Sequence, residues 1–318
     1  SDTWSGWTGR LSRGVDPTEA LAIRTAHPRY IVEAYAYLLP AAELETALEA
    51  NNDPAPVTLA VRPGLAETAE LIEAGARPGR WSPYAATWPG PPAELAAVRQ
   101  GRAGVQDEGS QLVALALAGL PADPGSWLDL CAGPGGKSAL LGGLARAAGG
   151  RLLAAEVSPH RADLVRAAVR GLGDGVEVVV ADGTRPAWPP ATFTRVLADV
   201  PCTGLGSLRR RPESRWRRDP AALAGLVGLQ RRLLDSAIDA AAPGGVIGYV
   251  TCSPHRAETR EVVAAALAGR DDVEPVDAAT LIGSVLPDLP DATDGPYLQL
   301  WPHRHGTDAM FAAYLRRK

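Results

Sequence analysis

The spacing of hydrophobic and polar positions changes twice along the chain. Residues 1–50 carry apolar residues at helical spacing, namely Ile31, Ala34, Tyr35 and Leu38, and then Leu44, Ala47 and Leu48. In residues 51–102, positions 57–61 alternate like a strand, positions 65–75 have a helical pattern, and turns rich in proline and glycine follow. These patterns predict an N-terminal helical segment at 1–50 and a small α+β module at 51–102.

From residue 103 to residue 318 the pattern becomes regular. Short apolar strands are expected at 126–132, 151–157, 176–181, 196–199 and 246–250, and helices are expected at 137–148, 160–173 and 219–241. Strands that alternate with helices are typical of a parallel sheet covered on both faces. The third part is therefore expected to be an α/β domain of Rossmann-like type.

Notable polar residues follow directly after these strands. Ligands of parallel α/β sheets bind at the carboxyl ends of the strands, so residues at those ends are expected to meet in one place. The residues in question are Cys131, Gly133, Glu156, Asp182, Asp199, Cys202 and Cys252. Their shared position predicts an active site at this edge of the sheet.

Composition and charge narrow the class of protein. The chain has 318 residues, 46% of them hydrophobic, and a formal net charge of −4. It has no apolar run long enough to span a membrane and no apolar signal-peptide segment near its start, so neither is expected. Three cysteines without a CxxC pair argue against a disulfide framework and a metal site, and we expect a cytoplasmic protein without a bound metal.

The segment CAGPGGKS at 131–138 is a glycine loop between a strand and a helix. A Walker motif needs glycine where Cys131 stands, and Ser138 replaces the third glycine of the dinucleotide fingerprint. Glu156 ends the next strand, where a carboxylate accepts hydrogen bonds from ribose hydroxyls, and Asp182 is placed to bind an adenine amino group. No cluster for a pyrophosphate is evident, so S-adenosylmethionine fits best. The alternative is an ordinary tight turn with surface carboxylates.

Cysteines at two strand ends indicate carbon methylation. Enzymes that methylate amino groups of bases usually have Asn/Asp-Pro-Pro-aromatic after the fourth strand, where this chain has Asp199, Val200, Pro201 and Cys202. C5 of cytosine accepts a methyl group only after a thiolate adds to C6, which is covalent catalysis. Asp199 is suited to bind the N3 and N4 edge of the ring, and a second acid–base group helps the C5 proton to leave. The residues alone leave open whether Cys202 or Cys252 attacks; Cys131 is best explained as a small buried side chain.

Three segments together resemble the RsmB/Nop2/Sun family of RNA cytosine-5 methyltransferases. They are LDLCAGPGGK at 128–137, DVPCTGLGSLRRRPESRW at 199–216 and YVTCSPHRAE at 249–258, and the likeness extends over residues 30–318. The resemblance, closest to the RsmB-type branch that acts on 16S rRNA, implies that Cys252 attacks C6. It also implies that Cys202 assists release of the product. DNA cytosine-5 methyltransferases instead attack with the cysteine of the motif that contains Cys202 in this chain.

The resemblance also assigns a cofactor site. It implies that S-adenosylmethionine contacts Cys131, Ala132, Gly133, Pro134, Gly135, Gly136, Lys137, Glu156, Arg161, Asp182 and Asp199. Relatives usually have Asp where Glu156 stands. Lys137 is implied to lie near the target base, and Gln106 and Asp107 to shape the cofactor pocket. The segment GTDAMF at 306–311 stands where relatives often have Asp-Gly-Phe-Phe, and its role stays open.

A basic segment directly follows the Cys202 loop. Arginine binds phosphate with two hydrogen bonds, and tryptophan stacks on an unstacked base. RNA-binding residues are therefore expected at Arg209, Arg210, Arg211, Arg215, Trp216, Arg217 and Arg218. The alternative is a solvated basic segment that pairs with neighbouring acids.

The expected function is S-adenosylmethionine-dependent methylation of cytosine C5 in RNA, with 16S rRNA as the expected substrate. The resemblance implies an RNA-recognition-like module at 51–102 and a remnant of a NusB-like domain at 1–50. RNA is the expected partner, without DNA or membrane, and the protein is expected to be a monomer. Alternatives are the same chemistry on tRNA or another RNA, and a non-catalytic RNA-binding factor in ribosome assembly. Paired cysteines argue against the last, because binding alone needs no thiols.

Overall fold

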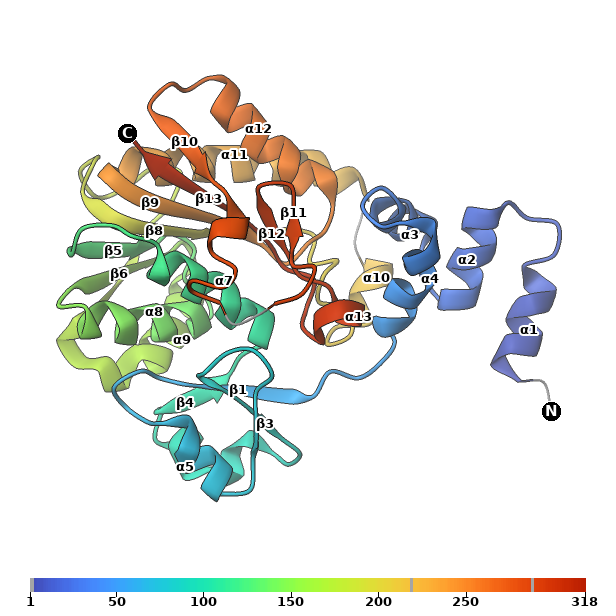
Figure 1. Cartoon of the computed structure of the whole chain (residues 1–318), viewed down its shortest axis with the longest axis horizontal. Helices are drawn as coiled ribbons and strands as arrows, with labels where there is room; N and C mark the ends of the chain where they lie inside the picture. The colour runs from blue at the N-terminus through green and yellow to red at the C-terminus, as the bar shows by residue number, and fades with distance from the viewer. Residues whose placement is uncertain (1–2, 218–219, 287–288) are drawn as a thin grey trace.

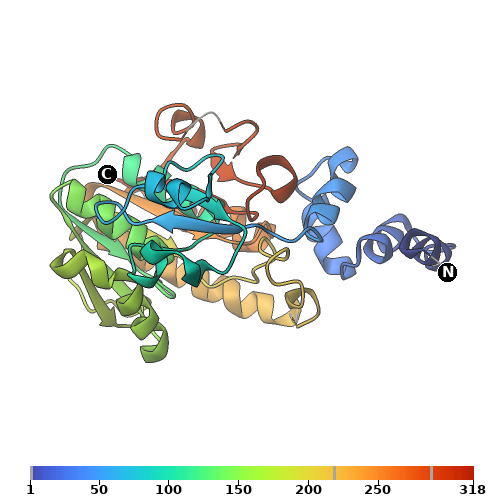
Figure 2. The same cartoon turned by 90° about the horizontal axis from the view of Figure 1, so that it is seen from below.

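The computed structural model describes residues 3–217, 220–286 and 289–318. Within these residues the chain forms a group of N-terminal helices, a small antiparallel sheet and a large α/β domain (Figure 1). The helices project from one side of the molecule, as Figure 2 shows from a second direction.

The N-terminal helices are α1 (Trp4–Leu11), α2 (Pro17–Thr25), α3 (Arg29–Ala36) and α4 (Ala41–Ala50). Asp16 caps α2, since its side chain accepts hydrogen bonds from the backbone N–H groups of Thr18 and Glu19. Ile31 and Tyr35 of α3 are fully buried, in a cluster that includes Leu205 and Trp301 of the large domain. These helices therefore pack against the loop that follows Cys202.

The small sheet has the strand order β2-β3-β1-β4, and every neighbouring pair is antiparallel. Its strands are β1 (Val57–Val61), β2 (Arg77–Pro78), β3 (Ala85–Trp88) and β4 (Ala103–Val105), accompanied by α5 (Thr68–Glu73), η1 (Pro92–Glu94) and α6 (Ala96–Arg99). The last strand lies just beyond residue 102, where the sequence predicted the module to end.

The large sheet contains five parallel strands in the order β9-β8-β5-β6-β7. Their bounds are β5 (Ser126–Asp129), β6 (Arg151–Glu156), β7 (Val176–Val180), β8 (Phe193–Asp199) and β9 (Ala241–Thr251). Each matches a predicted strand. The connecting helices are α7 (Glu108–Gly119), α8 (Gly136–Ala147), α9 (Pro159–Val169), α11 (Leu223–Ala240) and α12 (Arg260–Ala268), with the short turns η2 (Arg170–Gly175), η3 (Pro220–Ala222) and η4 (Arg256–Glu258).

The prediction of a purely parallel sheet is wrong at one edge. The final strand, β13 (Phe311–Arg317), runs antiparallel to β9, and it pairs in turn with β10 (Val273–Val276) and β12 (Tyr297–Gln299). β11 (Thr293–Asp294) completes this edge, and η5 (Ala278–Thr280) precedes it. The first five residues of β13 are all buried, so it lacks the alternation that would have marked it as a strand.

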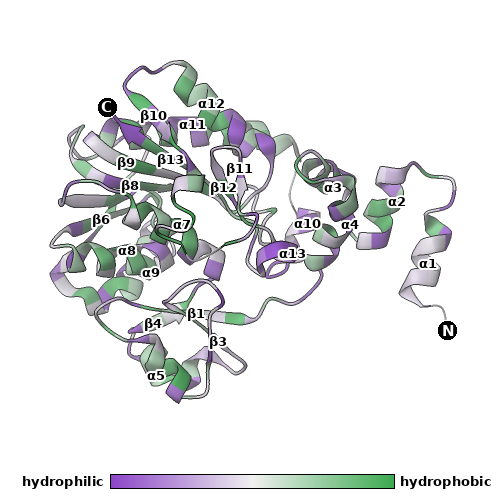
Figure 3. Ribbon diagram, in the orientation of Figure 1, coloured by the Kyte–Doolittle hydropathy of each residue, from purple (hydrophilic) through white to green (hydrophobic). Residues whose placement is uncertain are grey.

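Two hydrophobic layers cover the sheet. Trp127 and Leu197 point into the layer shared with α7 and α8, whereas their neighbours Leu128 and Val196 point into the layer shared with α11 and α12. In Figure 3, α7 is mostly hydrophobic, whereas α10 (Ser214–Arg217) and α13 (Pro302–His305) are hydrophilic. This packing fixes the strand ends from which the candidate site is built.

Candidate active site

The strand ends meet as the sequence predicted. Asp129, Glu156 and Asp199 are the last residues of β5, β6 and β8, and Cys252 follows β9. All four line one or both of two adjacent cavities that have Gly133, Pro134, Asp199 and Cys252 in common. We call them the larger cavity, of about 1060 Å³, and the smaller cavity, of about 360 Å³.

The glycine loop packs tightly against Glu156. Gly133 donates its backbone N–H to Glu156 Oε2 at 3.0 Å, and a Cβ added to Gly133 would lie 2.3 Å from the same oxygen. Gly135 has φ +109°, a conformation that favours glycine, and it precedes the first residue of α8. Glycine is therefore needed at position 133 for lack of space and at position 135 for its backbone conformation.

The larger cavity fits S-adenosylmethionine. It is lined by the predicted residues Cys131, Gly133, Pro134, Glu156, Arg161, Asp182 and Asp199. Each oxygen of Glu156 accepts one backbone N–H, from Gly133 or from Ser158, which leaves acceptor capacity for ribose hydroxyls. Arg161 lies beside them and donates to the carbonyl of Gly133 at 2.6 Å. Hydrogen bonds from Thr184 lower the pKa of Asp182, so this carboxyl is ionised where it faces the cavity.

Ala132, Gly136 and Lys137 lie on the other side of the glycine loop and line the smaller cavity. Lys137 Nζ forms an ion pair with Asp199 Oδ2 at 2.7 Å. Burial acts to lower the pKa of Lys137, but Asp199 outweighs it, and the pKa is raised above its usual value. Lys137 is therefore a fixed positive charge at the floor of the site.

The thiols of Cys202 and Cys252 lie 3.4 Å apart. The pKa of Cys252 is lowered because Cys202 donates a hydrogen bond to its sulfur, and the ammonium of Lys137 adds to this effect. The pKa of Cys202 is raised well above its usual value by the same hydrogen bond, by burial and by the charge of Glu258. Cys252 is therefore the more acidic of the two thiols.

Glu258 binds both cysteine loops, a role that no pattern in the sequence indicated. Its side chain is fully buried and accepts hydrogen bonds from the backbone N–H of Thr203 at 2.7 Å and the hydroxyl of Ser253 at 2.8 Å. Gln230 donates to the same carboxylate at 3.0 Å, as does the Thr203 hydroxyl. Since Thr203 follows Cys202 and Ser253 follows Cys252, one carboxylate fixes the two loops relative to each other.

Cys131, the third cysteine, behaves as the sequence analysis favoured. Burial and three nearby carboxylates raise its pKa well above the usual value, so it stays a neutral thiol. It packs against the hydrophobic layer of α11 while its edge contributes to both cavities.

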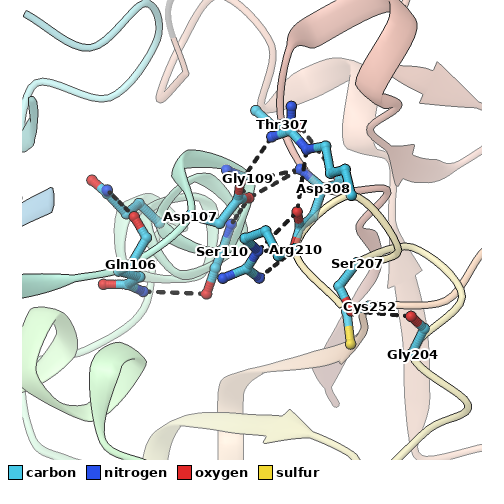
Figure 4. A network of polar contacts seen from close by, with 12 residues as sticks. Gln106, Asp107, Gly109, Ser110, Gly204, Ser207, Arg210, Cys252, Thr307 and Asp308 are labelled. Atoms are coloured by element: carbon cyan, nitrogen blue, oxygen red, sulfur yellow. Dashed lines mark hydrogen bonds and ion pairs between the residues drawn. The ribbon is translucent and has the colours of Figure 1, made fainter. Parts of the chain in front are cut away.

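Arg209 and Arg210 are held by acids inside the protein. Figure 4 shows that the side chain of Asp308 binds Arg210 and that its backbone N–H donates to Asp107. Asp308 is fully buried and pairs with both arginines, and Arg209 also donates to Asp107 at 3.3 Å. Asp308 belongs to the segment at 306–311 whose role the sequence left open. Its role here is to fix Arg210 at the wall of the smaller cavity.

Arg209 and Arg215, which the sequence analysis predicted to bind RNA, have side chains that pair with groups inside the protein. Arg215 is buried and donates to Asn52 Oδ1 at 2.6 Å and to the carbonyl of Asn51 at 2.7 Å. It therefore joins the Cys202 loop to the N-terminal helices. Arg211, Trp216 and Arg217 are exposed, and Trp216 is 68% exposed. Arg218 lies outside the described residues.

Two other features bear on the class of protein. In the parts of the chain that the structure describes, every helix is too short or too polar to cross a membrane. The same parts hold no group of three or more His, Cys, Asp or Glu side chains placed to bind a metal ion.

Comparisons with known proteins agree on one family. A family model described as 16S rRNA methyltransferase RsmB/F matches residues 114–316. A Mycobacterium tuberculosis protein named as a methyltransferase is 53% identical over 319 residues, which are 98% of this chain and 68% of that protein. The ribosomal RNA small subunit methyltransferase B of Erwinia tasmaniensis is 31% identical over 299 residues, 91% of this chain and 66% of that protein.

A solved structure shares the whole arrangement. The crystal structure of PH0851 matches with a TM-score of 0.83 at 26% identity and covers 95% of this chain and 69% of that one. The fold, the glycine loop with its two carboxylates and the family match all point to one cofactor and one class of reaction. The chain belongs to the RsmB/F family of S-adenosylmethionine-dependent RNA methyltransferases.

Proposed function

We propose that this enzyme methylates C5 of a cytosine in RNA, that Cys252 forms a covalent bond to C6, and that Cys202 completes the reaction. The observation that carries the proposal is the pair of thiols 3.4 Å apart, in which Cys202 and Lys137 lower the pKa of Cys252. Methylation of an amino group would need no thiol, whereas C5 chemistry needs a nucleophile and then an acid–base group.

The first step uses the charge distribution of the free site. The Cys252 thiolate adds to C6, and the electron pair of the C5–C6 bond moves towards C5 and the N3 edge of the ring. Asp199 and Cys252 line the same two cavities, so Asp199 is placed to bind N3 and N4 of the cytosine ring. Lys137 holds Asp199 in position through their 2.7 Å ion pair. When bound, S-adenosylmethionine supplies the electrophilic methyl group that C5 accepts.

The last step depends on a change in the pKa of Cys202. The largest cause of its raised pKa is the hydrogen bond to the sulfur of Cys252. That cause disappears once the Cys252 sulfur is bonded to C6 and carries no charge. Cys202 can then lose its proton to solvent and accept the C5 proton, and the electron pair released from C5–H expels the Cys252 thiolate. The state of one cysteine thus sets the acidity of the other.

The proposed substrate is 16S rRNA. Support comes from the relatives named ribosomal RNA small subunit methyltransferase B, and from the basic residues near the site, of which Arg211 lines both cavities. The small sheet is proposed to act as an RNA-recognition-like module, and helices α1–α4 are proposed to be a remnant of a NusB-like domain.

Two other functions predict different results. An enzyme for tRNA would use the same thiols and would methylate purified tRNA but leave rRNA unmodified. A ribosome-assembly factor without activity would bind RNA whether or not the cysteines are present.

The test is a denaturing gel of the protein incubated with S-adenosylmethionine and unmodified rRNA. Wild type, Cys202→Ala and Cys252→Ala are run together, with tRNA as a parallel substrate. The proposal expects a covalent protein–RNA band that accumulates in Cys202→Ala and is absent in Cys252→Ala. The reversed pattern would assign the attack to Cys202. Methyl transfer that survives in both variants would exclude covalent C5 chemistry.

A further inference from the structure

The smaller cavity lies where the small sheet meets the large domain. Its walls come from the end of β1 and from β4 on one side and from the glycine loop on the other, and Cys252 lines it as well. Helix α8 of the large domain packs against the segment that follows β1, since a Cβ added to Gly143 of α8 would lie 2.6 Å from the carbonyl oxygen of Pro63. A strand of RNA that reaches Cys252 through this cavity would therefore contact both units.

Arg62 is an unusual cation at this junction. Its side chain lines the smaller cavity, yet only 9% of the residue is exposed. It donates one hydrogen bond to the carbonyl of Gly101, and no Asp or Glu of the described residues forms an ion pair with it. Burial, together with the charge of Arg170, lowers the pKa of Arg62 to about 10, so it is still cationic at neutral pH.

A second guanidinium converges on the same place. A Cβ placed on Gly101 would lie 3.2 Å from Arg62 Nη1 and 3.0 Å from Arg170 Nε. Gly101 has φ +73° and no side chain, and both guanidinium groups pack closely against its bare face. Arg170 donates to the carbonyl of Arg99 at 3.0 Å and, like Arg62, has no carboxylate partner among the described residues.

Two guanidinium groups close together, one of them buried, repel each other unless an anion lies between them. A buried charge without a partner is costly, and phosphate is the anion that guanidinium groups bind best, through two parallel hydrogen bonds. Arg209 and Arg210 already have carboxylate partners, and the buried Arg215 donates three hydrogen bonds to other oxygens of the protein.

We propose that Arg62 and Arg170 form a binding site for a backbone phosphate of the substrate RNA. This phosphate would anchor the strand at the junction of the two units while the target base occupies the smaller cavity beside Cys252. The inference rests on the proposed function in so far as the phosphate belongs to RNA. It gives the small sheet a defined task, which is to supply one half of the anchor.

The test measures binding of an in vitro transcript of 16S rRNA over a range of salt concentrations. Wild type is compared with Arg62→Gln, Arg170→Gln and the control Arg166→Gln, which removes an equal charge one turn earlier on α9 from an arginine paired with Asp163. Loss of one charged hydrogen-bonding group is expected to weaken binding by at least about tenfold. The slope of log affinity against log salt should fall by about 0.7 to 0.9 for each phosphate that the variant no longer binds. Affinity for S-adenosylmethionine should stay unchanged.

Each outcome decides a point. If Arg62→Gln and Arg170→Gln bind the transcript as the control does, with the same salt slope, the phosphate site does not exist. If Arg62→Gln loses S-adenosylmethionine binding while RNA binding is unchanged, Arg62 serves the cofactor and the inference is wrong. Thermal melting identifies a variant that fails to fold, and the exposed Arg170 then provides the test alone.

The same samples separate this inference from the proposed function. A wild type that binds the transcript in an Arg62-dependent way without methylating it would retain the phosphate site and refute the function. Methylation that is equally fast in all four proteins at low RNA concentration would retain the proposed function and refute the phosphate site. A wild type that does not bind RNA would refute both.

Discussion

Replacing Glu258 with glutamine is expected to change which cysteine carries the proton, whereas replacing it with alanine is expected to destabilise the whole domain. Glu258 is fully buried, and one oxygen accepts from the N–H groups of Thr203 and Gln230. The other accepts from the hydroxyls of Thr203 and Ser253. A glutamine can keep its oxygen towards the N–H donors and turn its amide N–H towards the hydroxyls, because hydroxyls also accept.

The two variants therefore differ in size of effect. Alanine removes the acceptor of four buried donors, but the hydroxyls of Thr203 and Ser253 lie 3.0 Å apart and can bond to each other, so about three donors stay unsatisfied at about 1 to 3 kcal/mol each. A loss of at least about 3 kcal/mol is a large share of the 5 to 15 kcal/mol by which domains are typically stable. Glutamine loses the advantage of charged over neutral hydrogen bonds but leaves no N–H or hydroxyl donor unsatisfied, so its loss of stability is expected to be smaller than that of alanine. Urea denaturation of wild type and both variants measures the difference.

The charge of Glu258 has a separate, chemical effect. Together with the hydrogen bond to Cys252 and burial, it raises the pKa of Cys202. Without that charge Cys202 becomes more acidic, so a larger share of the thiolate lies on Cys202. One unit of pKa difference between the two thiols changes their thiolate ratio about tenfold.

Alkylation with iodoacetamide, followed by mass spectrometry of the two cysteine peptides, reads this ratio directly. In Glu258→Gln the yield at Cys202 relative to Cys252 should rise at every pH. Glu261→Gln is the matched control, because Glu261 lies on the surface in an ion pair with Arg256. An unchanged ratio in a folded Glu258→Gln protein would show that Glu258 does not set the position of the proton.

Three further predictions follow from the same geometry. Lys137→Met should move alkylation of Cys252 to higher pH, because the ammonium lowers the pKa of that thiol, and an unmoved pH profile would contradict this. Burial raises the pKa of Asp129 to about 7, so the folded state holds this proton more tightly than the unfolded state, and wild type should lose stability as pH rises from about 4 to 7. Asp129→Asn lacks that loss, so in urea denaturation its stability relative to wild type should rise between about pH 4 and pH 7, and a constant difference would refute the reasoning. Arg215→Ala should lower the melting temperature and leave the salt slope of RNA binding unchanged, whereas Trp216→Ala should weaken RNA binding without lowering the melting temperature, because Arg215 is buried and Trp216 is exposed.

The sequence predicted those parts of the fold that carry a local pattern. The five parallel strands and the helices α8, α9 and α11 were visible because short apolar runs alternate with amphipathic segments and end in glycine or polar residues, whereas α7 and α12 were not predicted. The antiparallel edge was not visible. β13 is almost entirely buried through its pairing with β9 and β10, and strand direction at a sheet edge is set by these distant partners and not by local spacing.

The same distinction applies to the site. The strand-end residues were found because parallel strands bring their carboxyl ends together, whatever the intervening sequence. Glu258 and Asp308 were missed because their partners are distant: Thr203 is 55 positions from Glu258, and Arg210 is 98 positions from Asp308. The burial of Arg215 was not foreseen, because a run of arginines looks the same in sequence whether its members face solvent or the interior.

The N-terminal helices form part of the support of the active site. The loop after Cys202 is held on its inner side by Glu258, through Thr203, and on its outer side by the helices. Tyr35 of α3 donates its hydroxyl to the carbonyl of Leu205 at 2.9 Å, and Arg215 donates to the end of α4 at Asn51. Because Cys202 lies on this loop, the 3.4 Å distance between the two sulfurs depends on contacts made by residues before position 52. The helices therefore help to set the geometry on which the proposed roles of the two cysteines rely.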